Sequence, residues 1–90
     1  MRVLISAGLA ALTLGATLAP SYAASCQRLW VERNAYYRRA GYCFKTPRAI
    51  SYFGNAGCRY DDENSVPLSA AVRQRIAEIV AQERIQGCSD

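Results

Sequence analysis

Four cysteines, Cys26, Cys43, Cys58 and Cys88, carry the most distinctive chemistry in this 90-residue sequence. They are separated by 16, 14 and 29 residues, whereas structural zinc sites take their ligands in close pairs, roughly two to four residues apart. The sequence contains no histidine, so the commonest nitrogen ligand for zinc is missing as well. An even number of cysteines in so short a chain predicts two disulfides, provided that the chain is exported.

The residues suited to acid–base catalysis are few. Without histidine the commonest general base is absent, and the serine and threonine hydroxyls have no imidazole to activate them. A carboxylate pair such as Glu32 with Asp61 is the remaining candidate for hydrolysis of a glycan, but no spacing singles it out. We therefore predict that the protein is not an enzyme and that it uses no metal and no cofactor.

Basic residues are concentrated in one half of the chain. Residues 24–60 hold seven cations and a single acid, whereas residues 61–90 hold three arginines and six acids. Arginine binds carboxylate and phosphate groups through two parallel hydrogen bonds. This pattern predicts either an external anionic partner, which is an envelope polymer such as peptidoglycan or an acidic protein, or neutralisation of the basic half by the acidic half. Nucleic acid is not expected as the partner of an exported protein.

A candidate binding face combines Tyr36 with Arg38 and Arg39. Tyr36 and Tyr37 are consecutive, so on a helix they point about 100° apart and cannot both face the core. An exposed tyrosine beside arginines suits stacking against a sugar or an anionic polymer.

The first 23 residues have the pattern of a signal peptide. Arg2 precedes an apolar run over residues 3–19, and Ser21 and Ala23 place small residues at a signal-peptidase site. We predict cleavage after Ala23, a mature domain over residues 24–90 without a membrane span, and a periplasmic or secreted location in a bacterium. The alternatives are a short membrane helix over the apolar run and lipidation of Cys26.

Capping residues predict three helices in the mature domain and an all-α fold. Each helix has a polar or proline start signal and a glycine stop signal. These residues are Ser25 and Gly41 for the first helix, Thr46 with Pro47 and Gly54 for the second, and Ser69 and Gly87 for the third. Between them we expect an extended stretch over residues 42–44, a turn over 55–57 and a solvated acidic connector over 59–67.

The helices restrict the disulfide pairing. A helix over residues 26–39 would hold Cys26 roughly 20 Å from Cys43, whereas bridged Cα atoms lie within about 7 Å. Cys58 and Cys88 flank the last helix, so the same objection applies to them. The preferred pairing is Cys43–Cys58 with Cys26–Cys88, which makes the two long helices antiparallel. Pairing 26–58 with 43–88 stays open.

One charged residue lies on the apolar stripe of each long helix, Arg33 in the first and Glu83 in the last. Antiparallel packing allows them to form a buried or half-buried ion pair, because buried charges are tolerated chiefly when they are matched. The alternative is that both side chains extend to water.

Residues 33–44 resemble the motif region of the YARHG domain, a small bacterial domain. The positions that carry the resemblance are Arg33, Asn34, Tyr37, Arg39, Gly41 and Phe44, and it extends over residues 26–86. Arg38 stands where the motif has alanine, and Ala40 stands where it has histidine. The resemblance implies an exported bacterial domain that acts at the cell wall and has no established activity. The four cysteines indicate a disulfide-bonded branch of the family.

Overall fold

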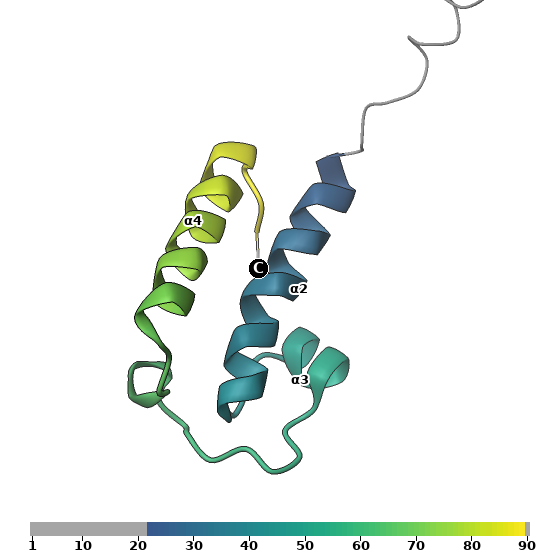
Figure 1. The fold of residues 1–90 in the computed structure, drawn as a ribbon. Coiled ribbons are helices and arrows are strands. Elements are labelled where there is room, and N and C mark those ends of the chain that lie inside the picture. The colour runs from purple at the N-terminus through teal and green to yellow at the C-terminus, as the bar shows by residue number, and fades with distance from the viewer. Residues whose placement is uncertain (1–21, 90) are drawn as a thin grey trace, which may run out of the picture.

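Two long helices lie side by side and antiparallel, and a short third helix packs near the C-terminal end of the first (Figure 1). The computed structural model describes residues 22–89. Within this range the helices are α2 (Tyr22–Ala40), α3 (Pro47–Phe53) and α4 (Ala70–Gln86), with a single 3-10 turn at Glu63–Ser65. The predicted all-α, three-helix fold is confirmed. The predicted signal peptide falls mainly on residues 1–21, which lie outside the described residues.

The start of α2 differs from the prediction. Ser25 lies inside the helix, which already begins at Tyr22, rather than capping it. The residues before Ser25 include two alanines, the strongest helix former, and no proline or glycine interrupts them. The helical conformation therefore extends past the serine towards the N-terminus.

Both long helices end as predicted, at a glycine in a left-handed conformation. Gly41 has φ +97°, and the next residue, Tyr42, donates its N–H to the carbonyl of Tyr37 at 3.0 Å. Gly87 has φ +71°, and Cys88 donates its N–H to the carbonyl of Glu83 at 2.8 Å. In each case a glycine supplies a backbone conformation that is costly for other residues, and the bond to the carbonyl five residues earlier satisfies a group at the helix end.

The two other predicted caps are confirmed. The Thr46 hydroxyl accepts the N–H of Ala49 at 3.2 Å at the start of α3, and Gly54 ends that helix. The Ser69 hydroxyl accepts the N–H of Val72 at 3.1 Å at the start of α4. These hydroxyl oxygens satisfy N–H groups that have no partner within the helix.

Two disulfides join the segments in the pairing that the sequence analysis preferred. Cys26 is bonded to Cys88, with 5.5 Å between the Cα atoms, and Cys43 is bonded to Cys58, with 5.1 Å between them. The first bond connects the beginning of α2 to the chain just after α4, where the C-terminal segment turns back towards α2 (Figure 1).

The ion pair between the long helices is formed. The Arg33 Nε and Nη2 atoms donate to the two carboxylate oxygens of Glu83 at 2.8 and 3.0 Å. Only 17% of the arginine side chain and 12% of the glutamate side chain are exposed. The two charges therefore fix the register of α2 against α4 at a position that is largely closed to water.

An aromatic cluster fills the space between α2, α3 and the intervening segment. Trp30, Phe44 and Ala49 are buried at its centre, and Phe53 stacks on Phe44 with 5.2 Å between the ring centroids. Asn55, to which the sequence analysis gave no role beyond a turn, holds this segment in place. Its side chain accepts the N–H of Phe44 at 2.7 Å and donates to the carbonyl of Phe44 at 3.0 Å.

The segments between the helices match the predictions in part. Residue Tyr42 forms an isolated parallel bridge with Tyr60, as expected for an extended stretch, and a turn closes where Cys58 donates its N–H to the carbonyl of Asn55. The acidic connector is not wholly solvated, because Val66 within it is almost completely buried. An apolar residue next to a proline lets the loop pack against the domain rather than extend into water.

Candidate functional site

The predicted binding face is only partly assembled. The Arg39 guanidinium lies over the Tyr36 ring, 5.1 Å from its centroid, and the Tyr36 hydroxyl donates to Glu32 at 3.2 Å. Arg38 is two residues from Tyr36, so it points to the other side of the helix, about 200° around the axis. Tyr36 and Arg39 thus lie together without Arg38, and the tyrosine ring is already in contact with a cation.

Several residues of the motif region have structural roles. Gly41 caps α2, and its carbonyl accepts the N–H groups of Arg59 and Tyr60 at 2.7 and 3.0 Å. Tyr37 packs against the aromatic cluster, and its hydroxyl donates to Glu63 at 3.3 Å. Burial, followed by the nearby Glu63 charge, raises the pKa of the Tyr37 hydroxyl above its ordinary value. These contacts join the end of α2 to the loop that follows Cys58.

Three further positions of the motif region lie around one hollow of about 440 Å³. Asn34 is buried and donates to the carbonyl of Trp30 at 3.0 Å, Phe44 belongs to the core, and Arg33 is paired with Glu83. Each of these side chains therefore has an internal contact. Of the motif positions, Arg39 alone is exposed within the described range.

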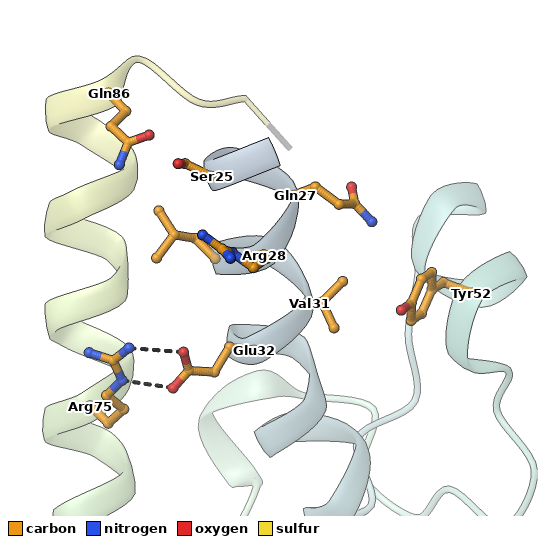
Figure 2. A pocket seen from close by; sticks show the side chains of 9 residues that line it. Ser25, Gln27, Arg28, Val31, Glu32, Tyr52, Arg75 and Gln86 are labelled. Carbon is orange, nitrogen blue, oxygen red and sulfur yellow. Dashed lines mark hydrogen bonds and ion pairs between the residues drawn. The ribbon is translucent and has the colours of Figure 1, made fainter. Parts of the chain in front are cut away.

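A wider groove of about 660 Å³ follows the outer surface of α2, between α4 on one side and Tyr52 of α3 on the other (Figure 2). Figure 2 shows Gln27 and Val31 of α2 on the side that faces Tyr52. We call this surface the α2 groove. Its lining residues are Ser25, Gln27, Arg28, Leu29, Val31, Glu32, Tyr52, Arg75 and Gln86.

The only acid of residues 24–60 lies in the α2 groove and is neutralised there. Arg75 of α4 donates to both oxygens of Glu32, at 2.7 and 2.9 Å (Figure 2). These hydrogen bonds hold the pKa of the Glu32 carboxyl below its ordinary value and raise the pKa of the Arg75 guanidinium. A carboxyl group that stays ionised at neutral pH is poorly suited to act as a general acid.

The carboxylate pair considered for catalysis is not assembled. Glu32 is bound to Arg75, whereas Asp61 accepts a hydrogen bond from Lys45 at 3.2 Å. The structure gives no contact between the two carboxylates, because different cations hold them. No group of three or more potential metal ligands occurs within residues 22–89.

The charges of the two halves cancel only in part. Of the seven cations in residues 24–60, two pair with acids of the other half, Arg33 with Glu83 and Lys45 with Asp61. The other five have no carboxylate partner among the described residues. They are Arg28, Arg38, Arg39, Arg48 and Arg59.

The acids of the second half are mostly in contact with the protein itself. Besides Glu83 and Asp61, Glu78 contacts Arg75, Glu63 accepts from Tyr37, and the Asp62 side chain caps the 3-10 turn. Asp61, Asp62, Glu63 and Glu78 are nevertheless exposed, and neither Asp62 nor Glu63 has a cation partner among the described residues, so the neutralisation considered from the sequence is incomplete.

Tyr52, for which the sequence analysis predicts no role, is 57% exposed. The helix that carries Tyr52 and Phe53 is too short to show a periodic pattern, so the sequence does not indicate which of the two rings faces the core. Gln27, on the facing surface of α2, was likewise not singled out. The structure thus identifies a more accessible aromatic ring than Tyr36.

No helix within the described range is both long enough and apolar enough to cross a bilayer. The disulfides fit an oxidising compartment, in which exported proteins fold.

Comparison with known proteins supports the family assignment. No curated protein and no solved structure matches the chain significantly. The family model of the YARHG domain matches residues 2–84, which is most of the chain. The residues that carry this resemblance form the C-terminal half of α2 and the segment that follows it. The chain belongs to the YARHG domain family.

Proposed function

We propose that this protein is an exported, non-catalytic module that binds an anionic polymer of the bacterial cell envelope, such as peptidoglycan. The observation that carries the proposal is the set of five arginines that have no carboxylate partner within residues 22–89, Arg28, Arg38, Arg39, Arg48 and Arg59. Arginine is less strongly hydrated than lysine and presents a planar set of donors, which favours contacts with carboxylate and phosphate groups.

The rest of the structure is consistent with a rigid, exported binding surface. Two disulfides and a largely buried ion pair fix the helices and the loop after Cys58 that carry these arginines. A binding surface held in place by its own scaffold loses little conformational freedom when a ligand binds. The protein would act in the periplasm or outside the cell, where peptidoglycan is accessible.

The test is co-sedimentation of the exported, processed protein with purified peptidoglycan sacculi over a range of salt concentrations. Retention should fall as salt rises, because exposed charges are screened over about 8–10 Å at 0.1–0.15 M salt. Insoluble cellulose, an uncharged polysaccharide, serves as the control matrix and should retain little protein.

A pair of variants separates the unpaired cations from the paired ones. Arg39→Gln removes a cation without a carboxylate partner, whereas Lys45→Gln removes an equal charge that Asp61 already neutralises in part. We expect Arg39→Gln to weaken retention more than Lys45→Gln does. Unchanged retention of a variant in which Arg38 and Arg39 are both alanine would contradict binding through the basic surface. Absence of retention on sacculi, with capture by an acidic protein instead, would favour a protein-interaction module.

A further inference from the structure

The aromatic ring of Tyr52 contacts other side chains of the protein on one side only. Its ring meets Trp30 edge to face, with 5.6 Å between centroids, and lies 4.7 Å from Phe53. The side chain is nevertheless 57% exposed, and its hydroxyl has no hydrogen-bond partner within residues 22–89. Two neighbouring rings therefore fix the orientation of a ring that remains open to a ligand.

Polar groups across the α2 groove from Tyr52 are oriented in a similar way. The Gln27 side-chain oxygen accepts from Arg48 Nη2 at 2.7 Å, and the Arg48 guanidinium lies 3.8 Å from the centroid of the Trp30 ring. The amide nitrogen of Gln27 and the guanidinium of Arg28 have no protein partner in the described range. An aromatic ring, an amide donor and the Arg28 guanidinium thus line one groove, and Arg48 lies beside it, bonded to Gln27.

We infer that the α2 groove binds a glycan strand whose pyranose rings carry carboxylate groups. This inference rests on the proposed function and names its site and ligand class. One sugar ring would stack on Tyr52, because the face of an aromatic ring is electron-rich and the C–H groups of a pyranose carry partial positive charge. Gln27, held by Arg48, would donate to a sugar hydroxyl, and Arg28 would bind the carboxylate.

The groove favours a sugar over an acidic protein. Stable protein interfaces bury about 800 Å² on each partner and place their strongest contacts in fully desolvated pockets. The α2 groove instead has one exposed ring, Tyr52, beside the smaller apolar side chains of Leu29 and Val31, and six polar or charged residues border them. An apolar strip bordered by several hydrogen-bonding groups suits a sugar chain, which has both apolar C–H faces and hydroxyl groups.

The test uses peptidoglycan that an amidase has separated into glycan strands, which keep a carboxylate on every second sugar, and free stem peptides. Titration of the processed protein by calorimetry should show binding to the strands and not to the peptides. Tyr52→Ala should weaken binding to the strands about two- to tenfold, since one aromatic stacking contact contributes about 0.5–1.5 kcal/mol.

Two control variants show whether the ring of Tyr52 itself is needed for binding. Tyr52→Phe keeps the ring, and Ile50→Ala removes an exposed apolar side chain from the same helix; each should stay within about twofold of the unmodified protein. Binding of the stem peptides rather than the strands, or unchanged strand binding by a folded Tyr52→Ala variant, would overturn the groove assignment. Salt-sensitive retention on intact sacculi would then still support the proposed function, whereas absence of both this retention and binding to the strands would overturn both proposals.

Discussion

The Glu83→Gln substitution should destabilise the domain strongly, because it leaves the Arg33 guanidinium facing a neutral amide. The carboxylate now accepts two hydrogen bonds, at 2.8 and 3.0 Å, in a pair whose side chains are only 17% and 12% exposed. Breaking a fully buried pair by removing one partner costs about 3–5 kcal/mol. Since glutamine keeps one acceptor and the pair has some access to water, we expect a loss of about 2–3 kcal/mol.

A loss of this size is a large part of the total, because a domain of this length has a free energy of unfolding of roughly 3–10 kcal/mol. The assay is urea denaturation with both disulfides intact, followed by the fluorescence of Trp30, the single and buried tryptophan. The matched control is Asp61→Asn, which removes a charge from an ion pair whose side chains are 55% and 86% exposed. That variant should lose less than about 0.5 kcal/mol.

The comparison between the two variants decides the argument. If Glu83→Gln lowered the free energy of unfolding no more than Asp61→Asn does, the Arg33–Glu83 pair would contribute no more than an exposed ion pair. That result would refute the expectation that burial makes this pair important for stability. A second variant, Arg33→Met with Glu83→Leu, should recover most of the loss, because apolar side chains of similar volume remove the cost of burying the charges. Failure of this double variant to exceed the stability of Glu83→Gln would show that the charges themselves are required for packing.

Three further predictions concern stability. Replacing both Cys26 and Cys88 by alanine should lower the free energy of unfolding by about 4 kcal/mol, because the disulfide joins residues 62 positions apart and so restricts the unfolded chain. A decrease in melting temperature no larger than that of a surface variant would argue against this bond. Hydrogen bonds from Arg75 hold the pKa of the Glu32 carboxyl below that of a free glutamate, so the stability that this ion pair contributes is present above the unfolded-state pKa and is lost as the pH falls through the folded-state pKa. Stability measured at falling pH should therefore decline less steeply for Glu32→Gln than for the unmodified protein, and identical declines would contradict the ion pair. Gly41→Ala should lower the free energy of unfolding by about 1–2 kcal/mol or more, since φ is +97° and an added Cβ would lie 3.4 Å from the Tyr60 ring. Chemical denaturation measures this loss, and an unchanged midpoint would be incompatible with the left-handed cap.

The sequence by itself determined where most helices begin and end. Thr46 with Pro47, Ser69, Gly41 and Gly87 act on backbone groups within a few residues of themselves, so their effect is readable locally. The exception is Ser25, where the preceding alanines extend the helix and a serine in its interior has no free N–H groups to cap.

The sequence also excluded one of the three possible disulfide pairings. A helix has a fixed rise per residue, so cysteines at its two ends are too far apart to bond. The same antiparallel arrangement suggested that Arg33 meets Glu83, and the structure shows that contact. Long-range contacts were thus predictable where the length of a helix, or the antiparallel arrangement of two helices, left few possible partners.

The tertiary structure alone decided which polar and aromatic side chains are free to bind. Glu32 is neutralised by Arg75, 43 residues away, and no sequence pattern indicated that pair. Trp30 is buried whereas Tyr52 is exposed, although their rings are in contact. The availability of a side chain depends on which neighbours the other helices bring to it, and helical periodicity within one segment does not contain that information.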